Sequence, residues 1–361
     1  MPKRAVAMFL VCAGMATLVS CINNTSNRYL YAALPTPNEI VVYREDPNSG
    51  VLTTLTISPV SAGLGVHSIA IHPSNKFLYA VNSFEDDISL YTVSASGALS
   101  EVTPRATTGT TPTQGVIDSA GQFLYVINSG SDNISSYSIG SGGTLTQVAG
   151  SPFPIGAGAI NMRVSPSGNF LYVTLGVGVG GSPGSIEIWP LNAGVLGMQG
   201  VQIVAAGTTP SGMAIDAAGA NLYVSNFGDN SISQYSIGTD GSLSVPHTIG
   251  AGLGVLSSPV ALQIDNSGKY LYVANETGST VVAYSIGTGG SLALLPANYS
   301  VATNSTPSVL ATDSSGNYLF VGNNVNPEIQ SFNLDTSTGV LTSVASYSLG
   351  GNGTTSIALS P

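Results

Sequence analysis

Short runs of aromatic and β-branched residues alternate along the chain with clusters of Gly, Ser, Asn and Asp. Such runs are typical of strands, and such clusters are typical of turns. No stretch shows the apolar period of a long amphipathic helix. The pattern therefore predicts an all-β protein.

Seven copies of one unit occupy almost the whole chain. Its Leu-aromatic core recurs in "RYLYA", "KFLYA", "QFLYV", "NFLYV", "NLYV", "KYLYV" and "NYLFV". The Leu residues of these cores are Leu30, Leu78, Leu124, Leu171, Leu222, Leu271 and Leu319. Successive copies are 46 to 51 residues apart, a period that is too long for most helical repeats and suits a four-stranded propeller blade.

Each unit supports four antiparallel strands. An inner strand, such as 211–216, leads into the Leu-aromatic strand; the third strand ends in an aromatic residue, and the fourth opens with Gly-x-Leu. These repeated residues have a structural interpretation, because Leu and aromatic residues would pack blades face to face and glycines would turn hairpins. Asn tolerates left-handed geometry and caps turns, and it ends most copies of the second strand, at Asn82, Asn128, Asn226, Asn275 and Asn323.

The two ends of the repeat array are complementary. The first copy lacks an inner strand, and the chain ends in "TTSIALSP", which reads as an inner strand without its own blade. Pairing the ends would complete one blade and remove two exposed sheet edges. We therefore predict a seven-bladed β-propeller of four-stranded antiparallel blades, closed by pairing of the N- and C-terminal segments, over residues 29–361.

The N-terminus has the features of an export signal. Lys3 and Arg4 precede an apolar run over 5–19, which is too short to span a bilayer. The run closes with "LVSC" at 18–21, which resembles the lipobox of bacterial lipoproteins; the alternative is an ordinary signal peptide with a chance Cys. We expect residues 1–21 to be a lipoprotein signal peptide ending at a lipidated Cys21, and residues 22–28 to be a polar tether. The expected location is the cell envelope, in the periplasm, outer membrane or cell surface.

Charge narrows the range of partners. Charged residues are 7% of the chain, where about 25% is usual. Cleavage before Cys21 would remove Lys3 and Arg4, which takes the formal charge from −10 to −12, and would leave Cys21 as the only Cys. No disulfide could then form within one chain. A cationic patch for nucleic acid is lacking, and we expect a monomer that touches the membrane only through its lipid.

The second-strand sequences "LYVSN", "LYVAN", "LYVIN" and "LYAVN" resemble the YVTN-type repeat. The whole chain after the signal resembles the seven-bladed lactonase family, which includes 6-phosphogluconolactonase-like proteins and the fungal muconate cycloisomerase. The resemblance implies a ligand site at one mouth of the central channel. Active members tend to carry Pro-Arg-His at the start of an inner strand and Asn-Glu after the second strand. There, Arg and His would hold a carboxylate or phosphate while an acid or base acts on the ester.

This sequence departs from that pattern. None of the seven positions of the Arg-His pair carries Arg-His; they hold His67-Ser68, Thr113-Gln114, Ile160-Asn161, Ser211-Gly212, Val260-Ala261, Ser308-Val309 and Thr355-Ser356. Only Asn275-Glu276 matches the Asn-Glu half. The catalytic candidates are therefore Glu276 and His67, because a carboxylate or an imidazole can act as a base. For His67, a hydrogen-bonded turn residue is the structural alternative. The ligand-binding candidates are Gln114, Asn161, Arg163 and Asn275.

Arg163 is unusual because other inner strands have Ala, Val or Gln at its position. A guanidinium there needs a partner or channel water, and Glu187 in the third strand of the same blade is one candidate partner. Two loops also differ between copies. The acidic loop at 84–87 lacks regular calcium-ligand spacing and is expected to be solvated, and the Gly-rich stretch at 176–184 lacks the Lys of a phosphate-binding loop and is expected to be a flexible lip.

Other chemistry finds little support. The three His residues lack zinc-ligand spacing, and no Gly-x-Ser-x-Gly is framed by a strand and a helix with His and Asp positioned after it, as a nucleophile elbow requires. We expect no metal and no cofactor. Two functions remain: a binding scaffold for a small molecule, glycan or protein at the channel mouth, with a degenerate lactonase site, and a lactone hydrolase. The loss of Arg-His favours the scaffold, and export disfavours 6-phosphogluconolactone because sugar phosphates are metabolised in the cytoplasm.

Overall fold

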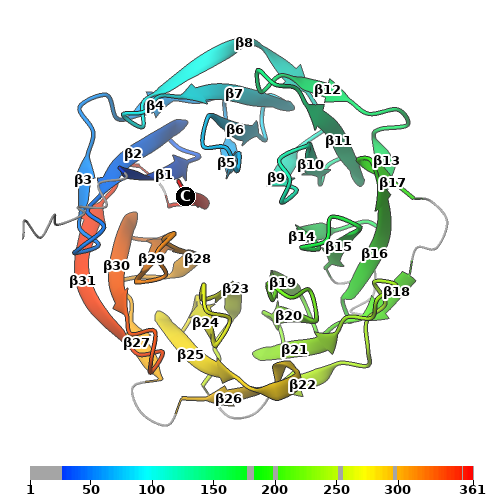
Figure 1. Cartoon of the computed structure of the whole chain (residues 1–361), viewed down its shortest axis with the longest axis vertical. Coiled ribbons are helices and arrows are strands. Elements are labelled where there is room, and N and C mark those ends of the chain that lie inside the picture. Colours follow the sequence, from blue (N-terminus) through cyan, green and yellow to red (C-terminus); the bar gives the residue numbers. More distant parts are fainter. Residues whose placement is uncertain are drawn as a thin grey trace, which may run out of the picture.

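The computed structural model describes residues 27–176, 183–197, 202–250, 255–295, 299–351 and 353–360. Their strands form seven antiparallel sheets arranged as a ring (Figure 1). Within these ranges the only helix is η1 (Thr288–Gly290), a single 3-10 turn. The predicted all-β, seven-bladed propeller is confirmed. The expected signal peptide at 1–21 and most of the tether lie outside the described residues, and the first strand already begins at Arg28.

The blades are numbered along the chain, and each is given from the axis outward. Blade 1 consists of β32 (Ser356–Leu359), β1 (Arg28–Leu34), β2 (Glu39–Glu45), β3 (Leu52–Thr54) and β4 (Val60–Ser61). Blade 2 consists of β5 (Val66–Ile71), β6 (Phe77–Asn82), β7 (Asp87–Val93) and β8 (Leu99–Thr107). Blade 3 consists of β9 (Pro112–Ile117), β10 (Phe123–Asn128), β11 (Asn133–Ile139), β12 (Leu145–Gln147) and β13 (Phe153–Pro154). Blade 4 consists of β14 (Ala159–Val164), β15 (Phe170–Leu175), β16 (Ser185–Asn192), β17 (Val195–Leu196) and β18 (Gln202–Ala205).

The last three blades follow the same plan. Blade 5 consists of β19 (Pro210–Ile215), β20 (Asn221–Asn226), β21 (Ser231–Ser236) and β22 (His247–Ile249). Blade 6 consists of β23 (Pro259–Ile264), β24 (Tyr270–Asn275), β25 (Thr280–Ile286), β26 (Leu292–Leu294) and β27 (Ser300–Ala302). Blade 7 consists of β28 (Pro307–Thr312), β29 (Tyr318–Asn323), β30 (Glu328–Leu334) and β31 (Leu341–Ser348). In blades 1, 3, 4 and 6, two short strands share the outer position and both pair with the third strand.

The hydrophobic core lies between blades and not within them. The buried apolar residues fall into seven clusters, and each cluster joins the facing surfaces of two neighbouring blades. The Leu of every second strand is fully buried, because successive side chains of these strands point to opposite faces and both faces are covered. The predicted face-to-face packing by the Leu-aromatic strands is confirmed.

The glycine in the turn between the third and fourth strands has a second role, which is to receive an aromatic residue of the preceding blade. In blade 3 this glycine is Gly143, whose φ is 80°. A Cβ on it would lie 2.6 Å from the ring of Phe77 in blade 2, and its carbonyl accepts a 2.7 Å hydrogen bond from the Tyr79 hydroxyl. The same contact with the preceding blade recurs at Gly97, Gly194, Gly241, Gly290, Gly339 and Gly50, with Asn221 as the partner at Gly290.

We expect Gly143→Ala to destabilise the fold by about 1–3 kcal/mol, because the added methyl group meets the Phe77 ring and the backbone must keep a left-handed conformation. Thermal and urea unfolding of the variant and the parent measure the effect. Gly142→Ala is the matched control, since a Cβ at the adjacent Gly142 meets nothing within 4 Å. Equal destabilisation by the two substitutions would contradict the role of Gly143.

Pairing of the chain ends completes blade 1, in agreement with the closure predicted from the sequence. β1 pairs antiparallel with β32 over Leu30–Leu359 to Ala33–Ser356. The Ser360 hydroxyl adds a 2.8 Å bond from the Tyr29 amide. In Figure 1 the C-terminus lies beside β1 on the inner side of the ring. This pairing gives β1 an inner neighbour and β32 a partner, so neither is left without the strand that the other six blades have at this place.

A buried charge cluster lies where blade 1 meets blade 7. The Arg28 guanidinium forms a 2.7 Å ion pair with Asp313 and lies 3.9 Å from Glu45. Both carboxylates are buried, and the two oxygens of Glu45 have no hydrogen-bond partner. Burial, and then the nearby Asp313 charge, raise the pKa of Glu45 to about 8, despite the opposing effect of Arg28. Desolvation dominates because Arg28 is committed to the closer Asp313.

Glu45 should make the protein less stable as the pH rises. Its pKa is raised on folding, from its ordinary value near 4.5 to about 8, so between these pH values the folded state holds a proton that the unfolded state releases. The free energy of unfolding should then fall by up to about 1.4 kcal/mol per pH unit. We expect Glu45→Gln to remove this fall. Urea unfolding from pH 5 to pH 8 measures it, and parallel pH profiles of parent and variant would show that Glu45 does not titrate in this range.

Candidate functional site at the channel mouth

The inner strands carry β-bulges near their starts. Register shifts leave one extra residue at this point in blades 2 to 7, and in blade 5 two inner-strand residues together face one residue of the second strand. The residues at this point are His67, Thr113, Ile160, Val260, Ser308, and Ser211 with Gly212. These are the positions at which the resembling family has its Arg. A bulge redirects a side chain out of the regular alternation of a strand, which explains why this position suits a functional residue.

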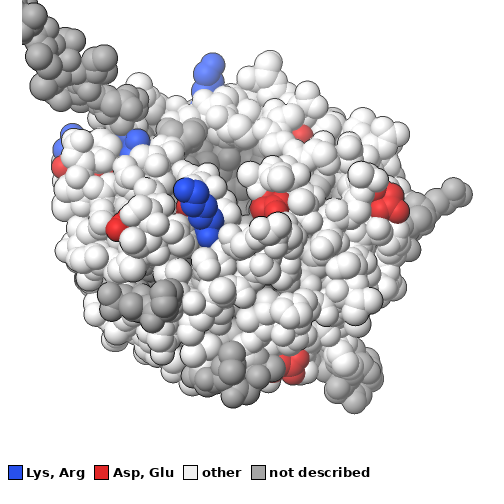
Figure 2. All heavy atoms as spheres, turned by 60° about the horizontal axis from the view of Figure 1, so that its bottom comes forward, with Lys and Arg blue, Asp and Glu red and all other residues white. Residues whose placement is uncertain are grey.

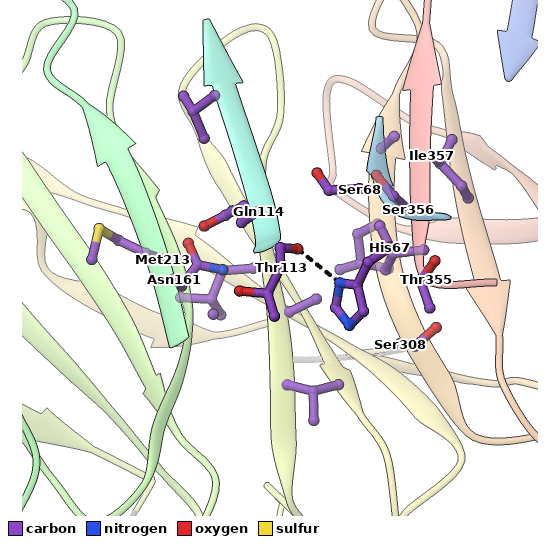
Figure 3. A pocket seen from close by; sticks show the side chains of 18 of the residues that line it. His67, Ser68, Thr113, Gln114, Asn161, Met213, Ser308, Thr355, Ser356 and Ile357 are labelled. Carbon is purple, nitrogen blue, oxygen red and sulfur yellow. Dashed lines mark hydrogen bonds between the residues drawn. The ribbon is translucent and has the colours of Figure 1, made fainter. Parts of the chain in front are cut away.

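A cavity of about 380 Å³ occupies the channel at this level, and inner-strand residues of all seven blades line it. Polar side chains line it on β5, β9 and β14, and Figure 3 shows His67, Gln114 and Asn161 on neighbouring strands of this arc. Val260, Ala261 and Leu262 of β23 form an apolar wall. Small-molecule sites are commonly concave and mostly apolar, with a few polar groups that fix orientation.

His67 is held in one orientation. Its Nδ1 lies 2.7 Å from the carbonyl oxygen of Thr113 in the next blade (Figure 3). A carbonyl can only accept, so Nδ1 carries the proton, and Nε2 of the neutral ring is an acceptor. The side chain is exposed and lines the cavity. The sequence offered a hydrogen-bonded turn residue as the alternative for His67; the structure combines this hydrogen bond with a free Nε2.

The second residue of the Arg-His pair of positions connects neighbouring blades in three places. The side-chain oxygen of Ser68 accepts a bond from the Gly115 amide at 3.2 Å. Gln114 Oε1 accepts one from the Met162 amide at 2.7 Å, and Ser356 Oγ accepts one from the Ile69 amide at 3.2 Å. The other end of the Gln114 amide, Nε2, has no hydrogen-bond partner among the described residues. It is not enclosed by protein atoms, and Gln114 lines the cavity, so Nε2 is available to a ligand.

Arg163 lies in the channel wall, three residues beyond the bulge of β14. Its Nη1 donates to Asn161 Oδ1 at 3.2 Å and to the Met162 carbonyl at 2.9 Å. Within the described ranges it forms no ion pair. Burial lowers the pKa of the Arg163 guanidinium, because desolvation penalises the charged form, but an arginine remains charged at neutral pH.

Glu187 is not the partner of Arg163. The Glu187 carboxylate is buried between blades, where Oε1 accepts from the Gly156 amide and Oε2 from the Trp189 indole, both at 3.0 Å. In the register of blade 4, Arg163 faces Tyr172 while Glu187 faces Val173, so the two side chains point to different faces. The sequence left two alternatives for Arg163, an ion pair with Glu187 or solvation in the channel. Since Glu187 points to the other face, the structure favours solvation in the channel.

Glu276 does not line the cavity. It is half-buried in the turn after β24, where its amide donates to the Ser258 carbonyl at 3.0 Å and its carbonyl accepts from the Ser279 amide at 3.3 Å. His67 is on blade 2 and Glu276 on blade 6. The structure therefore brings His67, Gln114, Asn161 and Arg163 to one cavity and leaves Glu276 outside it.

Asn275, a predicted ligand-binding residue, is buried and hydrogen-bonded within its blade. Its Nδ2 donates to Thr280 Oγ1 at 3.2 Å and to the Val255 carbonyl at 3.3 Å. The equivalent Asn residues donate to the side chain five positions later, in the pairs Asn82–Asp87, Asn128–Asn133, Asn226–Ser231 and Asn323–Glu328. All five fix the turn between the second and third strands.

Left-handed backbone geometry in these turns occurs at residues after the Asn. The positive φ values belong to Asp86, Asp132, Asn230 and Ser279. The predicted capping of the turn by these Asn residues is confirmed, and it is made by their side chains.

The acidic loop at 84–87 lies at the surface, with Phe84 and Glu85 exposed and Asp86 and Asp87 half-buried, and its carboxylates also make contacts. Arg105 forms ion pairs with Glu85 and, at 3.5 Å, with Asp87. The Asp86 carboxylate accepts a 2.7 Å bond from the Thr111 amide. Its carboxylates thus hold neighbouring segments together. Most of the Gly-rich stretch at 176–184 lies outside the described residues.

Among the described residues, no group of three or more His, Cys, Asp or Glu side chains converges to hold a metal ion. No helix in this part of the chain has the length and apolar character needed to cross a membrane. Figure 2 shows few charged side chains, scattered among uncharged ones, on the face in view. The channel cavity is therefore the candidate site that the described residues offer.

One cavity residue was not identified from the sequence. Gln263 lies on β23 and lines the same cavity as Arg163. Its Nε2 donates to the Ile264 carbonyl at 2.8 Å and to Thr312 Oγ1 at 3.1 Å. The available signal was a polar residue where most inner strands have Ala or Val.

Comparison with known proteins identifies relatives of this architecture. The family model described as "Lactonase, 7-bladed beta-propeller" matches residues 24–159, 130–305 and 257–359. A search of curated proteins found no match.

Solved structures share the fold at low sequence identity. A candidate 6-phosphogluconolactonase from Bacteroides fragilis superposes with a TM-score of 0.80 at 19% identity, covering 94% of this chain and 99% of the other. A Lactobacillus plantarum protein gives 0.79 at 18%, covering 93% and 99%. The periplasmic gluconolactonase of Pseudomonas aeruginosa gives 0.74 at 17%, covering 93% and 99%. At these identities the likeness is one of fold.

Proposed function

The chain belongs to the seven-bladed β-propeller lactonase family, and we propose that it is a binding member of that family, which holds a small polar molecule or the end of a glycan at the channel mouth. The observation that carries this proposal is the arc of polar atoms on β5, β9 and β14. Among the residues that the structure describes, none is a hydrogen-bond partner of His67 Nε2, Gln114 Nε2 or Asn161 Nδ2, and these three atoms are not enclosed. A ligand with hydroxyl or carbonyl groups could pair with all three.

The size and shape of the cavity support a small ligand. Its volume of about 380 Å³ lies within the range of about 300–1,000 Å³ typical of ligand pockets. The polar arc and the apolar wall of β23 differ in chemistry, so a ligand with one polar edge and one apolar edge would bind in one orientation. Such a two-sided surface is common to sugars and related rings.

The use of the Arg-His positions favours binding over hydrolysis. The side-chain oxygens of Ser68, Gln114 and Ser356 each accept a hydrogen bond from a backbone amide of the next blade. A residue that holds the scaffold together in this way cannot also reposition itself on a reacting ester. We therefore propose that the lactonase site of this chain is degenerate.

Lactone hydrolysis is the second candidate, and His67 is the observation that favours it. A neutral imidazole with its Nδ1 proton fixed by a carbonyl presents Nε2 as a base. If water were held beside Nε2, it could be activated for attack on a lactone carbonyl. A positively charged or amide donor would then have to stabilise the oxyanion.

We expect His67→Ala to weaken ligand binding roughly 2- to 10-fold, the effect of losing one hydrogen bond. A ligand-observed NMR screen of hexoses, sugar acids and short oligosaccharides provides the ligand and the affinities. His247→Ala is the matched control, because His247 is exposed on the outermost strand of blade 5. Binding that is indifferent to His67→Ala, or no binding at all, would reject the mouth as the site.

A lactone-opening assay separates the two candidate functions. The parent, His67→Ala and Glu276→Gln are compared with buffer on 6-phosphogluconolactone and simple sugar lactones. The binding proposal requires the parent to be no faster than buffer. Turnover by the parent that both substitutions abolish would establish the hydrolase in its place.

We further propose that the protein is exported and anchored in the cell envelope through Cys21. The support is the order of residues at the N-terminus: two basic residues, a short apolar run and the "LVSC" sequence at 18–21. A propeller tethered in this way would present its channel to solutes outside the cytoplasm.

Mass spectrometry of the protein expressed in a bacterium that processes lipoproteins should detect an N-terminal Cys21 peptide that carries acyl chains. Cys21→Ser should abolish the lipid and release the protein from membranes. An unmodified N-terminus at another residue, or a mature chain that retains Lys3, would refute the anchor.

A further inference from the structure

Arg163 interrupts a ring of small residues inside the channel. Seven inner-strand residues pair with the aromatic that follows Leu in the second strand: Ala70, Val116, Arg163, Ala214, Gln263, Ala311 and Ala358. Arg163 and Gln263 are the only polar members, and the residue between them around the ring is Ala214. Small neighbours leave space beside the guanidinium.

The channel wall has the opposite charge balance to the protein. The chain has 18 Asp and Glu against 8 Lys and Arg. Among the described residues that line the mouth cavity, none is Asp or Glu, and the ionisable ones are His67 and Arg163. A second cavity, of about 240 Å³, shares Arg163, Met213, Leu262 and Gln263 with the first and also has no Asp or Glu in its lining. Arg163 therefore faces two cavities without a carboxylate.

The hydrogen bonds of Arg163 leave one edge of the guanidinium free. Both bonds that it makes come from Nη1, and Nη1 has two hydrogens. Nε and Nη2 have no partner in the described part of the chain and are not enclosed by protein atoms, so they remain open to the channel. These two nitrogens share one edge of the planar guanidinium and can donate two parallel hydrogen bonds to one anion.

We propose that the free Nε and Nη2 edge of Arg163 binds a carboxylate group of the channel's ligand. This inference deepens the proposed function, because it gives the ligand at the mouth an acidic group that reaches three residues further along β14. A carboxylate matches the site in shape, since its two oxygens are spaced for the two donors. It also matches in charge: one anion balances one guanidinium, whereas a phosphate dianion would leave an unbalanced charge with no second cation in the lining.

Chloride NMR on the full chain in mild detergent tests the site without knowledge of the ligand. Chloride that binds Arg163 broadens the signal of free chloride, and acetate should displace it. We expect Arg163→Gln to weaken acetate binding roughly 10- to 100-fold, as for the loss of a charge-assisted pair. Gln is compatible with the fold, since Gln263 occupies the equivalent position in β23. Arg44→Gln removes the same charge at an exposed position and should change nothing.

The outcomes separate this inference from the function on which it rests. Acetate binding that is equal in the parent and Arg163→Gln, or displacement of chloride by inorganic phosphate and not by acetate, would overturn it. Arg163-dependent acetate binding with no sugar bound in the ligand screen would keep the carboxylate site and reject the proposed mouth ligand. Sugar binding that depends on His67, with no Arg163-dependent anion signal, would keep the proposed mouth ligand and reject the carboxylate site.

Discussion

The contact on which the ring depends is the one between an aromatic pair of one blade and a turn glycine of the next. At blade 2, Phe77 covers Gly143 and the Tyr79 hydroxyl donates to its carbonyl. Equivalent hydroxyl bonds from Tyr31, Tyr172, Tyr223 and Tyr272 occur at four further interfaces. The interface thus combines apolar burial with a directional bond. Because seven interfaces must add up to one full turn, each must set the same rotation, and a hydrogen bond fixes an angle better than apolar packing alone.

This constraint explains why the repeated residues are unavailable for chemistry. Most of the second-strand tyrosine hydroxyls donate to a turn glycine of the next blade, and the Asn amide nitrogens at the second-strand ends donate within their own turns. What varies between blades is the inner strand, whose bulge points a side chain at the axis. Function can therefore change at that position while the aromatic and glycine contacts between blades are kept, which fits a fold that supports different activities.

The sequence was sufficient for the fold because the period, the Leu-aromatic core and the orphan terminal strand all have local signatures. It identified the pair of positions at the inner-strand start, but not that the first of them is a bulge, since a bulge depends on pairing with a distant strand. It also paired Arg163 with Glu187 by nearness in one blade, whereas the register turns Glu187 away, toward Gly156 and Trp189. A contact that occurs at one blade interface alone, such as the ion pair of Arg28 with Asp313, joins residues far apart in the chain and leaves no pattern in the sequence.

Geometry is also the reason that we propose binding, and not ester hydrolysis, at the channel mouth. Hydrolysis needs a base, a reacting carbonyl and an oxyanion donor within hydrogen-bond reach of one another. Here the base candidate His67 is on blade 2, Arg163 lies three residues past the bulge of blade 4, and the Glu276 carboxylate is outside the cavity lining. Binding has a weaker requirement, because donors spread over several blades can each meet a different group of one ligand. The same separation that disperses a catalytic constellation gives a ligand several points of attachment.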